Sequence, residues 1–134
     1  MFRPVSSTEY VLLDPNAQAI IVACPMRTKL PALLETWSKR AVGIVGDSEQ
    51  YLPGLVRDIL ANPQIRVVCF VERACGREAY DAFWSGTGDP GWGIDLEHLN
   101  LVRQFVDLRD DDFTMKLAHQ PFWPTRLIYK EKTP

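Results

Sequence analysis

The stretch that decides the fold runs from Gly46 to Arg77 and reads GDSEQYLPGLVRDILANPQIRVVCFVERACGR. It combines a capped amphipathic segment, a turn at Asn62-Pro63, an apolar run and a charged loop that contains glycine. This order predicts a helix, a buried strand and a second helix, which is half of a parallel α/β unit. Open α/β sheets bind ligands at the carboxyl ends of their strands, so the loop after this strand indicates a site.

The predicted helix has a defined start and end. Asp47 and Ser48 are good N-cap residues because their side-chain oxygens accept hydrogen bonds from N–H groups of the first turn. An apolar stripe at helical spacing follows: Leu52, Leu55, Val56, Ile59 and Leu60. Pro53 fits only in the first turn, and Asn62-Pro63 ends the helix because the residue before proline avoids the α region. Residues 65–71 (IRVVCFV) are nearly all apolar, as in a strand covered on both faces.

The rest of the chain continues this alternation. Strands are predicted at 9–13, 19–24, 41–45 and 104–108, and helices at 31–39, 77–84, 96–103 and about 110–119. The first two strands are expected to pair as a hairpin across the turn at 14–16. Two prolines in 121–130 place any strand there at a sheet edge. The fold class is therefore α/β, with a mainly parallel, Rossmann-like sheet, flanking helices and room for an antiparallel edge strand.

Length and composition limit the class of protein. The 134 residues suit a single α/β domain with a loose N-terminal lead-in over residues 1–8. A net charge of −2 argues against nucleic acid as a partner. No apolar run approaches the roughly 18 residues of a membrane span, so no membrane partner is expected. The N-terminus lacks the apolar core of a signal peptide, which predicts a cytoplasmic protein.

Metal-binding patterns are absent from the sequence. The chain has three cysteines: Cys24, Cys69 and Cys75. They have no CxxC spacing, so reduced thiols are expected instead of a disulfide framework or a zinc site. His98 and His119 lack metal-ligand spacing, and the acidic cluster at 107–112 lacks the alternation and glycine of a calcium loop. We therefore predict no metal site.

Three loops are predicted to share the carboxyl edge of the parallel sheet, after the strands that end near Cys24, Val45 and Val71. Their residues form the candidate ligand site: Arg27, Thr28 and Lys29; Gly46, Asp47 and Ser48; Glu72, Arg73, Cys75, Gly76 and Arg77. Cations beside helix N-termini are typical of an anion site, which predicts an anionic or nucleotide-like ligand. The alternative is a set of ordinary solvated loop charges.

Cys75 and Glu72 are the candidate catalytic residues. A thiol at a helix N-terminus beside Arg73 and Arg77 lies in a setting that favours the nucleophilic thiolate. No histidine lies close to Cys75 in the sequence to act as its base, and the alternative is a small residue in a tight loop.

Aromatic residues gather in predicted loops: Trp84, Trp92, Phe122 and Trp123. The loop at 85–93 holds four of the eight glycines and is long enough for a lid or a partner-binding segment. Loop aromatics are favoured at partner surfaces because they bury a large area. Two interpretations stay open, namely a homodimer through Trp92 or the Phe122-Trp123 segment, and a local cover over the sheet edge.

A run of motifs follows in order along the chain. Asn62-Pro63-Gln64-Ile65-Arg66 leads into the apolar strand, and Gly93-Ile94-Asp95 and the RQFVDLRD segment at 103–110 come later. This run, over roughly residues 41–112, resembles the soluble domain of the corrinoid-carrying subunit of tetrahydromethanopterin S-methyltransferase. It also resembles a wider group of small domains of unassigned function, some attached to thymidylate-synthase-like proteins.

The resemblance implies an α/β domain and raises the question of a cofactor. In the methyltransferase the domain carries a corrinoid, and a histidine in the loop after the strand is the cobalt ligand. Here that loop reads Ala74-Cys75-Gly76-Arg77 and has no histidine, so a corrinoid would lack that axial ligand. Three functions stay open: a small-molecule-binding domain, an enzyme acting on a nucleotide or one-carbon substrate, and a protein-interaction module that has lost the ligand.

Overall fold

The computed structural model describes residues 1–23, 30–71 and 76–110 of the chain. Its strands are β1 (Val11–Leu12), β2 (Ala19–Ala23), β3 (Gly43–Gly46), β4 (Val67–Val71) and β5 (Asp107–Asp110). Its helices are α1 (Leu30–Trp37), the 3-10 turn η2 (Glu49–Tyr51), α2 (Leu52–Ala61), α3 (Arg77–Ser85) and α4 (Leu96–Phe105). Each predicted element within these ranges is present, with its ends shifted by a few residues. The predicted helix at 110–119 and the segment 121–130 lie almost entirely outside the described residues.

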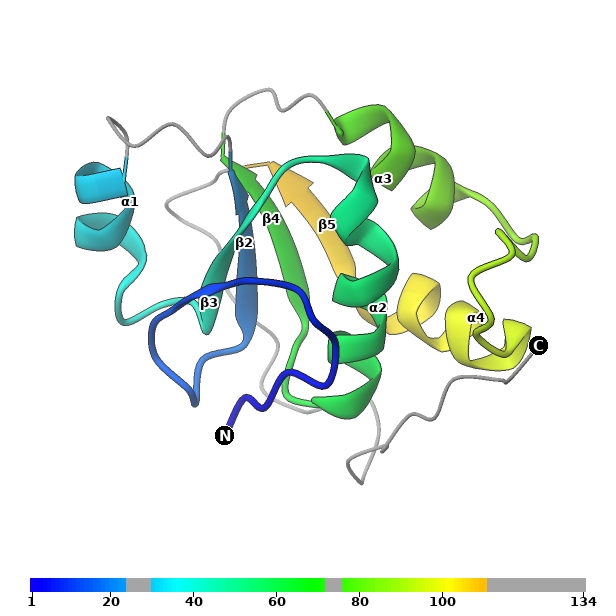
Figure 1. The fold of residues 1–134 in the computed structure, drawn as a ribbon, viewed down its shortest axis with the longest axis horizontal. Helices are drawn as coiled ribbons and strands as arrows, with labels where there is room; N and C mark the ends of the chain where they lie inside the picture. The colour runs from blue at the N-terminus through cyan, green and yellow to red at the C-terminus, as the bar shows by residue number, and fades with distance from the viewer. Residues whose placement is uncertain (24–29, 72–75, 111–134) are drawn as a thin grey trace.

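The strands form one sheet in the order β1-β3-β2-β4-β5, flanked by the helices (Figure 1). β1 is antiparallel to β3, and the other neighbours are parallel. The fold is therefore α/β with a mainly parallel sheet and an antiparallel edge strand, as the alternation predicted. Over the described ranges, no helix is long and apolar enough to cross a membrane.

The predicted hairpin between the first two strands is wrong. β1 pairs with β3 instead, with Val11 opposite Ile44 and Leu12 opposite Gly43. All five residues of β2 are buried, so this strand needs a neighbour on each side and a helix on each face. The two residues of β1 are exposed, and such a short strand suits the edge of the sheet.

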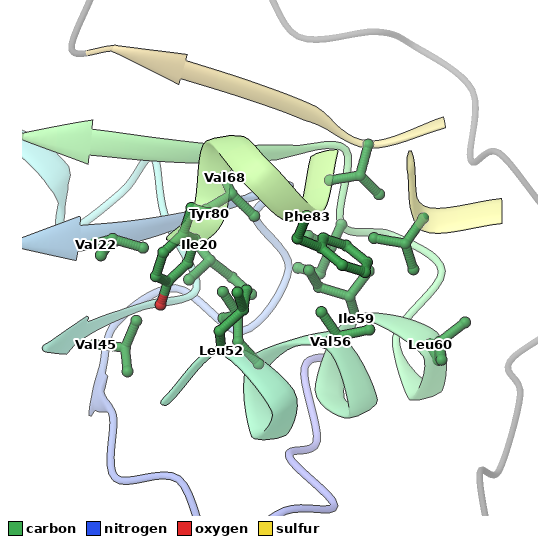
Figure 2. Packing of buried hydrophobic residues seen from close by; sticks show 14 of the residues in the cluster. Ile20, Val22, Val45, Leu52, Val56, Ile59, Leu60, Val68, Tyr80 and Phe83 are labelled. Carbon is green, nitrogen blue, oxygen red and sulfur yellow. The ribbon is translucent and has the colours of Figure 1, made fainter. Parts of the chain in front are cut away.

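The helices cover the sheet from both faces because the crossovers run in opposite directions. The β2–α1–β3 connection moves one way along the sheet, and β3–α2–β4 returns across β2 to the other side. Right-handed crossovers then place α1 and α2 on opposite faces. Ile21 packs with Trp37 of α1, whereas Ile20 and Val22 pack in the cluster formed with α2, α3 and α4 (Figure 2).

The predicted loose lead-in at residues 1–8 is instead fastened to α2 and its C-cap by hydrogen bonds from Arg3, Val5 and Ser6. Asp58 of α2 has no exposed surface. Its carboxylate accepts hydrogen bonds from the backbone N–H groups of Val5 (2.7 Å) and Ser6 (2.8 Å). It also accepts from the hydroxyls of Ser6 (2.7 Å) and Tyr10 (2.6 Å). We call residues 2–10 the N-terminal strap.

A second anchor fastens the start of the strap. The side chain of Asn62 accepts a hydrogen bond from the backbone N–H of Arg3 and donates one to the backbone carbonyl of the same residue. Phe2 is only 6% exposed, and its ring meets the ring of Tyr10 edge-on at 5.3 Å. Helix α2 therefore contributes its apolar side to the core, while Asp58 and the C-cap residue Asn62 hold the strap.

Candidate functional site

The carboxyl ends of β2, β3 and β4 lie at one level of the sheet. Ala23, Gly46 and Val71 are the last residues of these strands, and Ala23 pairs with both of the others. The connection from β2 leads to β3 on one side, while the connection from β4 leads to β5 on the other. The boundary between β2 and β4 is therefore a topological switch point, the place where open α/β sheets bind ligands.

The structure describes only part of the predicted site. Five of its residues lie within the described ranges: Gly46, Asp47, Ser48, Gly76 and Arg77. The others lie outside them: Arg27, Thr28, Lys29, Glu72, Arg73 and Cys75. Both candidate catalytic residues belong to this second group. The described part of the site therefore consists of the loop after β3 and the start of α3.

These two segments touch at Gly76. A Cβ atom on Gly76 would lie 2.0 Å from the backbone oxygen of Asp47 and 3.0 Å from the backbone nitrogen of Glu49. Gly76 has an ordinary φ of −89°, so the close backbone approach requires glycine here, not an unusual conformation. The structure thus brings together two of the three loops that were predicted to form the site.

The two predicted N-caps have different roles. The hydroxyl oxygen of Ser48 accepts from the backbone N–H of Gln50 at 3.5 Å and caps the turn η2. Regular helix begins at Leu52, so Pro53 falls in the first turn as predicted. Asp47 is turned inward and only 5% of it is exposed. The edge therefore carries a buried carboxylate directly after β3.

Arg77 is engaged within the protein. Its Nε donates to Asp81 at 2.9 Å, and its Nη1 donates to Asp110 at the end of β5. The guanidinium lies 4.7 Å from the centre of the Phe70 ring. Burial lowers the pKa of Arg77, but the hydrogen bonds and charges of Asp81 and Asp110 outweigh it, so the pKa is raised overall. Two carboxylates thus neutralise this cation, as in the alternative of ordinary paired loop charges.

Tyr80 lies within the helix predicted at 77–84, and the sequence did not mark it as a site residue. The residue has no exposed surface, and its ring packs edge-on against Phe70 at 4.8 Å and parallel to Trp84 at 6.3 Å. Figure 2 shows the hydroxyl pointing toward Val45, one residue before the end of β3. Among the residues that the structure describes, no group forms a hydrogen bond with this hydroxyl.

The electrostatic setting keeps the Tyr80 hydroxyl protonated. Burial, and then the charge of Asp47, raise the pKa of Tyr80 above its ordinary value. Both effects disfavour the phenolate, because it would be a second negative charge in a region of low dielectric. At neutral pH the side chain is therefore a fixed, uncharged hydrogen-bond donor. No pattern in the sequence marks such a donor, since its lack of a partner depends on the packing of α3.

Two hollows lie near the edge. One, of about 630 Å³, lies between η2, α3 and the loop at 86–92, and its lining is mainly apolar, including Leu52, Phe83 and Trp92. The other, of about 670 Å³, lies between the N-terminal strap and η2 with the start of α2, and its lining is mainly polar. Both have the size of small-molecule pockets, and both are open to solvent.

Trp84 and Trp92, the two predicted loop aromatics within the described ranges, pack against other parts of the same chain. Trp84 donates from its indole N–H to the backbone carbonyl of Val106 at 2.9 Å. The ring of Trp92 lies 5.0 Å from that of Phe83, and its backbone carbonyl accepts from Arg57 at 2.6 Å. The loop at 85–93 is therefore folded back onto α3. The Phe122-Trp123 segment lies outside the described residues, and the homodimer stays a prediction.

The described residues offer no metal centre, since they contain no group of three or more His, Cys, Asp or Glu side chains that suits a metal ion. His98 lies on α4 and not in the loop after β4, so it does not replace the histidine that a corrinoid domain uses. Cys69 is a buried thiol in β4.

Comparisons with known proteins add no family. No family model matches the chain, and no curated protein matches it. The geometry shows an α/β protein with a topological switch point at the carboxyl edge of its sheet. The resemblance to the methyltransferase domain stays a prediction.

Proposed function

We propose that this protein binds a small anionic or nucleotide-like molecule at the carboxyl edge of its sheet, beside the loops that follow β2, β3 and β4. The observation that supports this best is the switch point between Ala23 and Val71, where adjacent parallel strands end together and their connections diverge. Ligands of open α/β sheets bind at this place because the diverging connections leave a crevice there.

An anionic group suits the elements that begin at this edge. Helix α3 has nine residues and starts directly after the loop that follows β4, so its first N–H groups favour negative charge there. The predicted cations Arg27, Lys29 and Arg73 belong to the loops after β2 and β4. The whole chain has a net charge of −2, so attraction of an anion must come from such local groups.

Binding is tested first without assuming a ligand. Native mass spectrometry of freshly purified protein reports any retained molecule and the number of chains in the assembly. A thermal-shift panel of AMP, ADP, inorganic phosphate and hydroxocobalamin follows, and we expect a nucleotide to raise the unfolding temperature because it binds only the folded state. No shift with any compound would contradict the proposal and favour the protein-interaction module. A coloured protein that retains cobalt would favour the corrinoid alternative.

A pair of matched variants tests the location of the site. Ser48→Glu adds a negative charge at the carboxyl edge, whereas Ser38→Glu adds the same charge after α1, near the opposite edge. We expect Ser48→Glu to weaken binding of ADP about tenfold or more by charge repulsion, and Ser38→Glu to leave it unchanged. Equal affinities of the two variants for ADP would place the ligand elsewhere on the protein.

A further inference from the structure

The side chain of Tyr80 is fully buried, and its hydroxyl has no hydrogen-bond acceptor within the described residues. Its ring contacts the rings of Phe70 and Trp84, which limits the positions that the hydroxyl can take. In the described part of the chain nothing forms a hydrogen bond with it. A buried polar group without a partner destabilises the fold, and native proteins keep few of them without a ligand, a water or a catalytic role.

The surroundings of this hydroxyl select the partner that it suits. Asp47 is buried directly after β3, and its backbone oxygen lies against Gly76, at the start of the helix that carries Tyr80. The Tyr80 hydroxyl points toward Val45, two residues before Asp47 (Figure 2). A phosphate oxygen is disfavoured at this point because it would meet the carboxylate. A hydroxyl oxygen is favoured, since it accepts from the phenol and donates to a carboxylate at the same time.

We propose that Tyr80 and Asp47 together receive a hydroxyl group of the bound ligand, which makes the ligand a nucleoside phosphate or sugar phosphate and not a bare anion. This inference rests on the proposed function and adds the ligand class. Asp47 directly follows β3, the second parallel strand along the chain. In many α/β nucleotide-binding proteins an acidic residue that follows the second parallel strand binds the ribose hydroxyls.

The start of α3 and the buried pair then bind different parts of one molecule. The phosphate lies at the N-terminus of α3, where N–H groups are available, and the sugar hydroxyl lies between Asp47 and Tyr80. Gly76 allows this arrangement because it brings the backbone of α3 against that of Asp47. Tyr80 has no exposed surface, so a ligand reaches its hydroxyl only when the described segment at 47–51 or the start of α3 moves.

Tyr80→Phe tests this inference, with Tyr10→Phe as its matched control. Both changes remove one phenolic oxygen, but the Tyr10 hydroxyl already donates to Asp58. The probes are AMP, ribose 5-phosphate and inorganic phosphate, with affinities from calorimetry. We expect Tyr80→Phe to keep or raise the unfolding temperature of the free protein. We expect it to weaken the binding of AMP and of ribose 5-phosphate about tenfold and to leave the affinity for inorganic phosphate unchanged. Tyr10→Phe lowers the unfolding temperature and leaves all three affinities unchanged.

The other outcomes separate this inference from the proposed function. If the probes bind and Tyr80→Phe binds AMP as well as the wild type, the inference is overturned and the edge site stands. A water molecule offers the same chemistry as a sugar hydroxyl; a lower unfolding temperature for Tyr80→Phe with unchanged affinities indicates water alone and overturns the inference. If the wild-type protein binds none of the three probes, both the proposed function and this inference are contradicted.

A second variant covers the case in which Tyr80→Phe does not fold. Asp47→Asn keeps the shape of the side chain and removes the negative charge, which favours a ligand hydroxyl over a phosphate oxygen at this point. We expect it to weaken AMP and ribose 5-phosphate and not to weaken inorganic phosphate. Equal losses for AMP and phosphate, or no loss for either, overturn the inference.

Discussion

Two tyrosines, each near a buried aspartate, lie in different regions of this protein. In the N-terminal strap, the Tyr10 hydroxyl donates to Asp58 at 2.6 Å. At the carboxyl edge, Tyr80 is fully buried near Asp47, whereas Tyr10 is only half-buried, and the Tyr80 hydroxyl has no hydrogen-bond partner within the described ranges. The residue types are the same, but the two tyrosines differ in burial and in the hydrogen bonding of their hydroxyls.

This difference separates a structural network from a candidate binding site. Asp58 accepts from two backbone N–H groups and two hydroxyls, so its charge is compensated entirely within the protein. Such a network holds a segment in place and has no capacity left for a ligand. The Tyr80 hydroxyl can still form a hydrogen bond, so it can bind a ligand reversibly.

The largest effect is expected for Asp58→Ala. The substitution leaves the four donors of the strap without their acceptor, and hydrogen bonds to a charged group contribute about 1.5–3 kcal/mol each. We expect the free energy of unfolding to fall by at least ~3 kcal/mol in urea denaturation. Glu35→Ala, at an exposed position of α1, is the control and should change it by less than ~0.5 kcal/mol. A loss below ~1 kcal/mol for Asp58→Ala would show that the strap contributes little to stability.

The next largest effect is expected for Gly76→Ala at the carboxyl edge. The new Cβ would lie 2.0 Å from the backbone oxygen of Asp47, so one backbone segment must move. We expect a loss of about 2–3 kcal/mol in the free energy of unfolding, together with weaker nucleotide binding. Gly88→Ala is the matched control, because no atom lies within 4 Å of its Cβ position, and it should be nearly neutral.

Gly54→Ala sharpens the comparison with the strap. Its Cβ would lie 2.2 Å from Thr8 Oγ1, which is the end of a side chain and not backbone. Rotation of Thr8 relieves the clash, and alanine is favoured over glycine inside α2 by up to about 1 kcal/mol. We therefore expect a smaller loss of stability than for Gly76→Ala, measured in the same urea titration. A larger loss would show that the strap packs more rigidly than the edge.

A smaller effect is expected for Tyr10→Phe. The phenylalanine cannot donate to Asp58, while the other three donors to the carboxylate remain. We expect a loss of about 1–2 kcal/mol, against no loss for Tyr80→Phe, which removes a hydroxyl without a partner. Equal losses for the two variants in thermal denaturation would contradict the distinction between the Tyr10 hydroxyl, which donates to Asp58, and the Tyr80 hydroxyl, which has no partner in the described ranges.

The smallest effect is expected in the alkaline pH dependence. The pKa of Tyr10 is raised by burial and then by the charge and hydrogen bond of Asp58, and that of Tyr80 by burial and then by Asp47. Unfolded tyrosines lose their protons near pH 10.0 while the folded ones retain them, so this contribution is present below pH 10.0 and is lost as the pH rises further. We expect each phenylalanine variant to reduce the slope of stability between pH 10 and 11 by about 1.4 kcal/mol per pH unit at most. Unchanged slopes in both variants would contradict the raised pKa values.

The local sequence pattern was sufficient to predict the helices and strands and the edge of the sheet at which the candidate site lies. The apolar run at 65–71 and the stripe from Leu52 to Leu60 have the periods of a buried strand and an amphipathic helix, and both are present. Parallel strands joined by helices must end at one edge, so Gly46–Ser48 and Gly76 were placed together correctly. The hairpin prediction failed because the turn at 14–16 does not select the neighbour of β1.

The sequence by itself determined which segments are helices and strands, that the sheet is mainly parallel, and which edge its loops share. Only the tertiary structure decided that Arg77 is neutralised, that Asp58 holds the strap, and that Tyr80 keeps an unused hydroxyl. The physical reason is range. Hydrophobic period and capping act over a few neighbouring residues, whereas the partner of a buried polar group depends on side chains that are distant in the sequence and meet only when the sheet is assembled.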